Sequence, residues 1–395
     1  MPLLLLALAL VTRLDVVLSG DGWTTPDAVR RLVSTHPGGL YDSTELDRDL
    51  VRLRTLGILY DVKAQVDGSR VEIDARDRWS LLPVLGLRRG GGRTTARVGA
   101  TDHNAFGKLF TLYGELTSNA DVPFLGGDRI GSLVYGEFPR AFGTRFTPYL
   151  SWTREFLGFD AFGKGFTFER SRYALRSELR YELSDLVAVM AGVEGRKDRY
   201  DKSAAPATDT VSALVGLTVG YVEDLVSQQR GTELRLVGEV ARTGELTAVA
   251  QARAYFIPSP DHNLCFQALL QDTTGSSESF MFHAGGLREI RGFIDSYFVG
   301  AFIARVNAEW HIDVLRSNVV VPFIGQVAAF VDGGYVGRRA GAVAGLDYQG
   351  AVLSGGLGVR GIPIPFARAV GRVDVAAGIV PRRTIDVSFS GQQFF

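Results

Sequence analysis

From Thr94 to the last residue, Phe395, the sequence alternates between apolar and polar side chains with a period of two. In the segment 172–183 the odd positions are mostly aromatic or aliphatic, and most of the even positions are Arg or Glu. The segment 302–311 repeats the pattern with the opposite parity. Successive side chains of a strand point to opposite faces. Each such segment therefore predicts a strand with one apolar face and one charged face.

Two architectures fit this alternation. A soluble sandwich alternates because the apolar face of each sheet packs on the core. A transmembrane barrel needs strands of ~9–11 residues that are apolar toward lipid and polar toward the lumen. Many strands here are about ten residues long, and their polar faces carry both signs of charge. We therefore predict an all-β transmembrane barrel over 94–395 with sixteen antiparallel strands.

The barrel hypothesis assigns a face to each side chain. Arg176, Glu178, Arg305 and Glu309 are expected to face the lumen, and Tyr173, Leu179, Phe302 and Trp310 to face lipid.

Charge and cysteine content exclude several classes of function. Lys+Arg and Asp+Glu both number 43, so the chain carries no net charge and no basic field for nucleic acid. Cys265 is the only cysteine, which excludes an intramolecular disulfide and a thiolate metal cluster. The five histidines are scattered without ligand spacing. We expect neither a metal site nor a cofactor.

The first residues form an apolar run over 1–12 that is too short to cross a bilayer as a helix. The sequence Ala7-Leu8-Ala9 is typical of a signal-peptidase site, although no Lys or Arg precedes the run. We interpret this segment as an imperfect signal-like sequence that predicts export.

Residues 13–79 predict a small α/β domain with the order strand, helix, helix, strand, strand. Thr25-Pro26 supplies a hydroxyl N-cap and a proline at the first helical position. Asp42 is the expected N-cap of a second helix, which is amphipathic. A hairpin follows over 62–75. Residues 80–93 are expected to link this domain to the barrel.

This order of elements resembles a POTRA domain of the BamA/TamA-type outer-membrane superfamily. The sequence Leu56-Gly57-Ile58-Leu59-Tyr60-Asp61-Val62 stands where that family has a leucine-glycine-aromatic step before its second strand. A generic small α/β domain is the alternative interpretation.

Further motifs resemble the same superfamily, also called the bacterial surface antigen family, in the order in which the family has them. They are His103–Lys108 with an asparagine-phenylalanine-glycine turn after the first strand, Arg291-Gly292-Phe293 between the eleventh and twelfth strands, Phe330–Gly334 in the thirteenth, and Ser354–Pro363 with Arg372–Asp374 in the penultimate strands. The last residues are similar to a C-terminal β-signal, although Gln393 interrupts the aromatic alternation.

The resemblance implies a lumenal site. In this family the loop arginine reaches into the lumen and meets the aspartate-bearing strand, so the expected pair is Arg291 with Asp332. Phe330, Asp332 and Gly334 share strand parity and would all face the lumen. Gly292 and Phe293 complete the motif of this lid loop. The pair is expected to fix a plug rather than to catalyse.

The resemblance also implies a seam between the first and last strands. The first strand, around 95–101, is expected to close the barrel against 385–395. Gly391 lies inside the last strand, where a glycine weakens pairing. Phe389, Gly391 and Phe395 are the expected seam and β-signal residues.

Enzymatic interpretations find little support in the sequence. Gly356–Gly361 matches G-x-G-x-x-G, but it lies in a strand pattern with no following helix. No G-x-S-x-G elbow of a patatin-type lipase occurs. Cys265 is interpreted as a packed small apolar residue. We expect that the protein is not an enzyme.

The function that the resemblance implies is insertion or translocation of client proteins by an outer-membrane barrel whose POTRA domain lies in the periplasm. The expected partners are the lipid bilayer, client outer-membrane or secreted proteins, and a periplasmic partner at the POTRA domain. The alternative is a passive pore, receptor or scaffold, or a lipid-handling relative, because the family's assembly proteins carry several POTRA domains.

Overall fold

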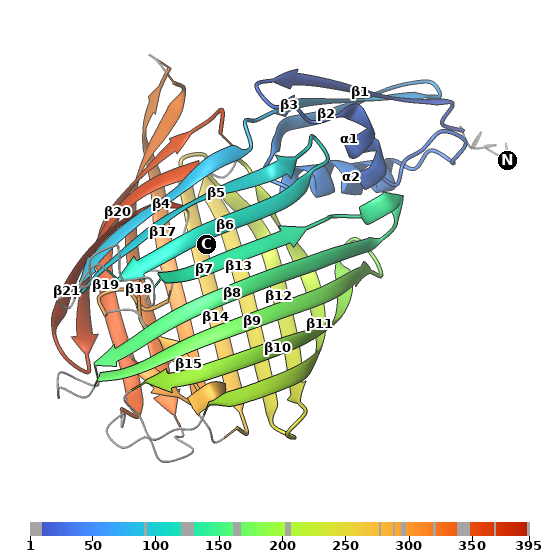
Figure 1. Ribbon diagram of the computed structural model, residues 1–395. Coiled ribbons are helices and arrows are strands. Elements are labelled where there is room, and N and C mark those ends of the chain that lie inside the picture. Colours follow the sequence, from blue (N-terminus) through green and yellow to red (C-terminus); the bar gives the residue numbers. More distant parts are fainter. Residues whose placement is uncertain are drawn as a thin grey trace, which may run out of the picture.

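The computed structural model describes residues 10–90, 93–119, 130–160, 167–201, 207–275, 278–286, 289–293, 298–318, 321–337, 348–366 and 369–392. Sixteen strands form a closed antiparallel barrel, and a small α/β domain lies at one end of it (Figure 1). The barrel and the total of sixteen strands that the alternation predicted are confirmed, although one of these strands, Leu81–Gly90, precedes the predicted range 94–395. The end that carries the α/β domain is called the near end below, and the opposite end the far end.

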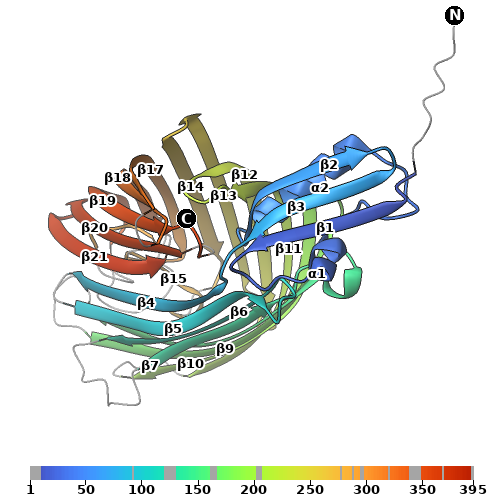
Figure 2. The ribbon, with the colours of Figure 1, turned by 90° about the horizontal axis from the view of Figure 1, so that it is seen from above.

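The α/β domain is a three-stranded sheet covered by two helices (Figure 2). Its elements are β1 (Arg13–Gly20), α1 (Pro26–Leu32), α2 (Ser43–Thr55), β2 (Leu59–Asp67) and β3 (Arg70–Asp77). The central strand β3 runs parallel to β1 and antiparallel to β2. The Thr25 hydroxyl accepts a hydrogen bond from the Ala28 N–H, and the Asp42 carboxylate accepts one from the Thr44 N–H. Both N-caps that the sequence predicted are therefore present.

The core of this domain is formed by apolar side chains of both helices against one face of the sheet. Val29, Leu53, Leu59 and Ile73 are fully buried there. Neither described helix is long and apolar enough to cross a membrane.

The barrel strands follow one another around the wall in chain order. They are β4 (Leu81–Gly90), β5 (Arg93–Ala105), β6 (Phe110–Asn119), β7 (Ile130–Glu137), β8 (Phe146–Asp160), β9 (Thr167–Glu182), β10 (Val187–Asp201), β11 (Thr208–Asp224), β12 (Gln229–Ala241), β13 (Leu246–Ser259), β14 (His262–Thr273), β17 (Phe302–Ser317), β18 (Phe323–Gly337), β19 (Gly350–Pro363), β20 (Ala369–Val380) and β21 (Thr384–Gln392). Between β14 and β17 lie the turn η4 (Glu278–Phe280) and a ribbon of β15 (Phe282–Ala284) and β16 (Phe298–Gly300). Another short turn, η2 (Ala141–Gly143), precedes β8.

The linker expected over 80–93 is wrong, because residues 81–90 form β4, the first barrel strand. The strand that contains 95–101 is β5, the second, and β4 closes the barrel against β21. The asparagine-phenylalanine-glycine turn accordingly follows the second strand. The sequence hid β4 because Leu82 and Val84 are buried on its inner face while Leu85 is exposed on its outer face. With both faces apolar, the period of two disappears.

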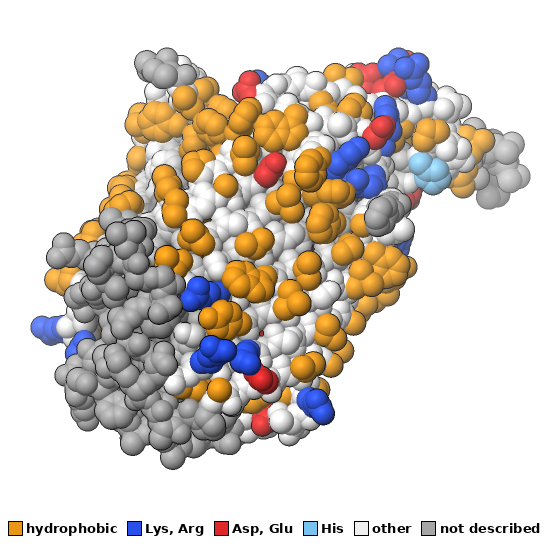
Figure 3. All heavy atoms as spheres, in the orientation of Figure 1, with side chains coloured by type: hydrophobic (Ala, Val, Ile, Leu, Met, Phe, Trp, Pro, Cys, Tyr) orange, Lys and Arg blue, Asp and Glu red, His pale blue; other side chains and the backbone are white. Residues whose placement is uncertain are grey.

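The predicted inside and outside of the wall are confirmed at the described positions. Glu309 is buried on the inner face and the Glu178 side chain is only 9 % exposed there, whereas Leu179 and Trp310 are each 45 % exposed on the outer face. Figure 3 shows hydrophobic side chains spread over the outer surface of the barrel strands. An apolar outer band with charges inside is the arrangement that a bilayer requires of a barrel.

Candidate functional site

The segment between β14 and β17 folds into the barrel lumen. Ile290, Arg291, Phe293 and Phe298 are each 2 % exposed or less, although they belong to a loop. The ring of Phe293 packs edge-on against Phe298 at 5.0 Å between centroids. Because these side chains meet inward-facing residues of the wall, the loop is a plug and not a surface excursion. We call the described residues of 278–300 the lid loop.

The structure brings Arg291 and Asp332 together. The Asp332 carboxylate accepts hydrogen bonds from Arg291 Nε at 2.7 Å and Nη2 at 2.6 Å. It accepts a third from the Arg291 backbone N–H at 3.0 Å. A bidentate arginine–carboxylate pair fixes orientation as well as distance. Asn307 on β17 also donates to Asp332, at 2.9 Å, and to the Glu289 carbonyl, at 2.6 Å.

Arg291 has a second anionic partner, Glu309 of β17, which is fully buried. Glu309 in turn contacts His311 and Arg360. Arg360 continues the network to Asp374, which also binds Arg372. Within this cluster three arginines face three carboxylates, so the buried charges balance. Buried charges require such pairing.

The alternation placed Glu309 in the lumen, but neither its pairing with Arg291 nor its contacts with His311 and Arg360 were predicted. Glu309 and His311 stand two residues apart on one strand, so their shared face was readable from the alternation. Which face of β19 and β20 would meet them was not readable, because that depends on barrel closure.

Phe330 lies under the loop arginine. The centre of the Arg291 guanidinium is 3.5 Å from the Phe330 ring centroid, a cation–π geometry. The ring has room because residue 356 is glycine: a Cβ there would lie 2.5 Å from Phe330 Cζ and 2.2 Å from the Val375 carbonyl oxygen.

Two more wall glycines receive side chains of the lid loop. A Cβ on Gly334 would lie 3.1 Å from Ile290 Cδ1, and one on Gly378 would lie 2.7 Å from Phe293 Cζ. Gly292 has a φ of +85°, a conformation that glycine adopts without strain. Its Cβ position is also filled, by the Gly378 backbone N at 2.6 Å. The glycines therefore set how closely the loop approaches the wall.

The beginning of the lid loop is anchored on a different part of the wall. Arg172 of β9 donates to the Ser279 carbonyl at 2.6 Å and to Asp198 of β10 at 2.8 Å. The Arg196 guanidinium lies 4.9 Å from the Phe280 ring centroid. The lid loop thus bridges the lumen from β9–β10 to β17–β18. No motif in the sequence indicated this second anchor.

The seam between β4 and β21 is short. In the described part of the chain five residues of each strand are in register, from Gly86 opposite Ser390 to Gly90 opposite Asp386, compared with six between β7 and β8 and fifteen between β17 and β18. Of the residues expected at the seam, Phe389 pairs with Leu87 and is about half exposed on the outer face. Gly391 lies at a shift in register between β20 and β21. Phe395 lies outside the described residues.

The α/β domain contacts the barrel through the asparagine-phenylalanine-glycine turn between β5 and β6. Asn104 accepts a hydrogen bond from Trp23 Nε1 at its carbonyl, at 2.9 Å, and donates one to the Thr24 hydroxyl at 2.7 Å. The Gly107 carbonyl accepts the Thr25 N–H at 3.0 Å. A Cβ on Gly107 would lie 2.5 Å from the Trp23 carbonyl oxygen.

A second contact lies across the near end of the barrel. Arg52 of α2 forms an ion pair with Asp185 in the turn between β9 and β10. Arg140, in the turn between β7 and β8, donates to the Leu32 carbonyl at 2.8 Å. The domain is therefore held at both sides of the barrel mouth.

The chemistry available at the lumenal cluster is ionic. Among the described residues, no group of three or more His, Cys, Asp or Glu side chains has a geometry that would hold a metal ion. The Cys265 thiol is buried, 3.8 Å from His311 Nδ1. The geometry supports the positioning of a loop.

Fold and site together define a class: a sixteen-stranded barrel of the transmembrane type, with an N-terminal α/β domain and a loop bound inside the lumen. Solved structures share this fold at low sequence identity. CdiB from Escherichia coli aligns with 97 % of this chain and 76 % of its own at a TM-score of 0.64 and 12 % identity. CdiB from Acinetobacter baumannii aligns with 97 % of this chain and 74 % of its own, at a TM-score of 0.62 and 14 % identity.

BamA from Haemophilus ducreyi lacking POTRA domains 1–3 aligns with 96 % of this chain and 84 % of its own, at a TM-score of 0.52 and 14 % identity. No protein-family model and no curated protein matches the sequence. The chain therefore has the fold of the BamA and CdiB barrels.

Proposed function

We propose that this protein is an outer-membrane barrel that inserts or translocates client proteins through the β4–β21 seam, without catalytic chemistry. The observation that carries the proposal is the shortness of the seam. A closed barrel leaves no strand edge exposed to lipid. Among the described residues the seam has five register pairs, against six between β7 and β8, so it is the barrel interface whose opening releases the fewest described backbone pairings.

The charged anchors of the lid loop lie away from the seam, and the loop touches one seam strand, because Thr384 of β21 donates a hydrogen bond to the Gly292 carbonyl. The charged anchors lie on β9–β10 and β17–β18, so β4 and β21 carry neither the Arg291 cluster nor the Arg172 anchor. Separation of the seam strands would leave those anchors in place. A client strand would then pair with the exposed edge of β4 or β21, as in β-strand addition.

The α/β domain is proposed to be a POTRA domain in the periplasm. Its strand-helix-helix-strand-strand order and its position at one barrel mouth support this assignment. In its sheet, β3 is central and β1 and β2 are the edges. An edge strand can accept an extended segment of a client or a partner protein by β-augmentation.

A disulfide across the seam tests the mechanism. In a Cys265→Ser background, Arg88→Cys and Ser388→Cys place two cysteines at directly paired positions of β4 and β21. Cα atoms of antiparallel pairs are ~4.5–5.5 Å apart, within the range of a disulfide. In liposomes, insertion of an unfolded eight-stranded outer-membrane barrel is followed by its heat-modifiable gel mobility. Oxidation should stop insertion, and reduction should restore it.

The matched control places cysteines on a directly paired, buried position away from the seam, Ser212 and Ala241 of β11 and β12. This disulfide should form without affecting insertion. Undiminished insertion by the oxidised seam variant would exclude the gate mechanism.

A passive pore is the second candidate. The lumen contains a cavity of about 540 Å³ lined by charged side chains, among them Arg176, Glu178 and Arg235. A pore would conduct ions in a planar bilayer whether or not the seam is locked. Conductance that is unchanged by the seam disulfide, together with no insertion activity, would favour the pore.

A further inference from the structure

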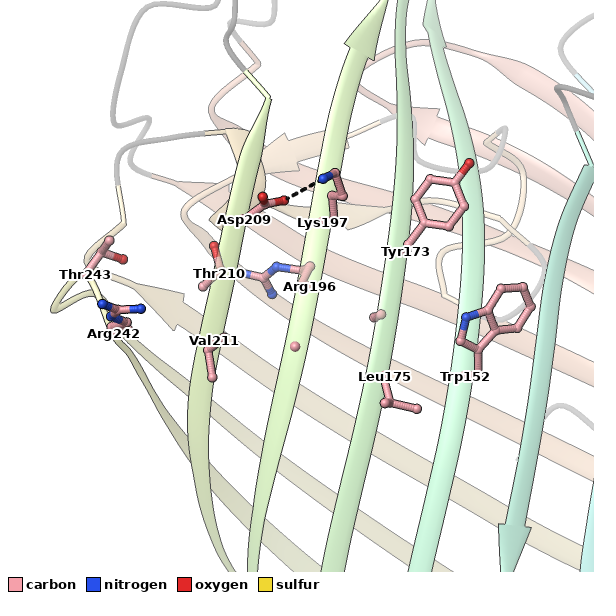
Figure 4. Close-up of a pocket in the computed structure, with 12 residues that line it drawn as sticks. Trp152, Tyr173, Leu175, Arg196, Lys197, Asp209, Thr210, Val211, Arg242 and Thr243 are labelled. Carbon is pink, nitrogen blue, oxygen red and sulfur yellow. Dashed lines mark ion pairs between the residues drawn. The ribbon is translucent and has the colours of Figure 1, made fainter.

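The outer wall of the barrel has a hollow of about 670 Å³ over strands β8 to β11, toward the far end (Figure 4). Trp152, Leu175 and Val211 form its apolar sides and are each between 40 and 56 % exposed. These three residues lie in one row across the strands, because Trp152 pairs with Leu175 and Val211 pairs with Gly195, the partner of Leu175.

Gly195 creates the space. It occupies an outward position in the middle of this row, and a Cβ built on it would have no atom within 4 Å. The neighbouring outward position on the same strand, Val193, is 57 % exposed and fills its part of the surface. The hollow therefore forms because Gly195 has no side chain, whereas the outward positions around it carry apolar side chains.

Charged side chains line the side of the hollow that is toward the far end. The next outward row toward the far end contains Arg154, Tyr173, Lys197 and Asp209 in register. Lys197 and Asp209 form an exposed ion pair at 3.5 Å, and the Arg154 guanidinium lies 5.6 Å from the Tyr173 ring centroid. Arg242, in the turn after β12, also lines the hollow.

The charge at this rim is unequal. The exposed cations Lys197 and Arg242 and the half-buried Arg154 are accompanied by one carboxylate, Asp209, among the described residues that line the hollow or lie in this row. Arg242 forms no ion pair with a described residue. An apolar hollow with a cationic rim, bordered by Trp152 and Tyr173, has the polarity of a membrane interface.

We propose that this hollow binds one lipid of the surrounding bilayer, with a negatively charged phosphate headgroup. An acyl chain lies over Gly195 against Trp152 and Leu175, and the phosphate meets Lys197 and Arg242. The site rests on the barrel spanning a bilayer, but it does not depend on insertase activity.

Quenching of Trp152 fluorescence tests the proposal in the full-length protein. Liposomes of phosphatidylcholine contain either brominated phosphatidylglycerol or brominated phosphatidylcholine at equal mole fraction. The Trp152 signal is the difference between the protein and its Trp152→Phe variant. We expect the ratio of anionic to neutral lipid at Trp152 to exceed the bulk ratio by about fivefold or more, since one surface cation alone accounts for about fivefold.

Two sets of variants separate the headgroup from the chain. The exchange Lys197→Gln with Arg242→Gln should abolish the preference for the anionic lipid and leave quenching by both lipids. Gly195→Leu should fill the hollow and lower quenching by both. Gly114→Leu is the matched control, because Gly114 also has no atom within 4 Å of its Cβ position and lies on another part of the wall.

Trp310 on the outer face, isolated by Trp310→Phe, should be quenched equally by both lipids. Equal quenching of Trp152 by both lipids, or a preference that survives the double exchange, would overturn the proposed site. Absence of quenching at both tryptophans would overturn the bilayer placement, and the site with it.

Discussion

The carboxylate of Asp332 accepts three hydrogen bonds from Arg291, two from the guanidinium and one from the backbone N–H. The pair therefore fixes the main chain of the lid loop as well as its arginine. Since both side chains are almost fully buried, neither has water as an alternative partner. Loss of either one leaves an uncompensated charge inside the barrel.

Arg291→Ala and Asp332→Ala are each expected to cost ~3–5 kcal/mol of loop binding, the range for breaking a buried pair. The double variant should cost less than the sum, with a coupling of ~0.5–3 kcal/mol. Hydrogen exchange of lid-loop amides in the folded barrel measures the free energy of opening.

Arg305 supplies a control for this cycle. Its ion pair with Glu289 is longer, at 3.6 Å, and lies at the same loop. Arg305→Ala and Glu289→Ala should show weaker coupling. Additive effects of the exchanges at Arg291 and Asp332 would mean that the loop is not held by this pair.

Gly356→Ala should lower the stability of the barrel by crowding the Phe330 ring. The new Cβ would meet the Val375 carbonyl oxygen at 2.2 Å and the Phe330 ring at 2.5 Å. Overpacking of this kind costs ~1–3 kcal/mol. Gly361→Ala on the same strand has no atom within 4 Å and should be neutral. The two variants are compared by urea unfolding in liposomes; equal stability of both would contradict the packing.

The outward position of Ala308, between Val306 and Trp310 in the middle of β17, is testable by charge. Ala308→Arg should cost ~2–4 kcal/mol, the cost of an arginine on the lipid face near the midplane. Thr218→Arg points into the lumenal cavity and should be tolerated. Folding yield in liposomes compares the two. Tolerance at position 308 with failure at 218 would reverse the inside and the outside of the barrel.

Asp77 gives the α/β domain a pH dependence. Its carboxylate is buried and accepts the Thr24 N–H at 2.6 Å, and burial raises its pKa above 3.8 despite this bond. The folded domain therefore holds the proton to higher pH than the unfolded chain. The contribution of Asp77 to the stability of the domain is therefore full below pH 3.8 and is lost as pH rises through the raised pKa.

Unfolding in urea, followed by the fluorescence of Trp23 and Trp79, should show this decline, and Asp77→Asn should remove it. Asp15 does not obscure the result. Hydrogen bonding, chiefly with Arg13, lowers the pKa of Asp15, so its contribution is lost only as pH falls below 3.8. A wild-type stability that rises from pH 4 upward would contradict the assignment to Asp77.

The sequence predicted the barrel because strand alternation is local. Most strands carry their own apolar and charged faces, so these strands and the inward direction of Glu309 follow from neighbouring residues, as do the helix caps at Thr25 and Asp42. The pairing of Arg291 with Asp332 was expected from a resemblance and is present in the structure. β4 was missed because its two faces are both apolar, and a uniform run has no period.

What the sequence by itself determined is thus the set of alternating strands, the two faces of the wall and, through the resemblance, the motif that enters the lumen. Only the tertiary structure decided that β4 pairs with β21. It also decided that Arg172 and Asp198 anchor the beginning of the lid loop. The contacts of Phe330 with Gly356 and of Phe293 with Gly378 belong to the same group. These contacts join residues far apart in the chain. Their partners are set by barrel closure and strand stagger, which are properties of the whole sheet that no single segment encodes.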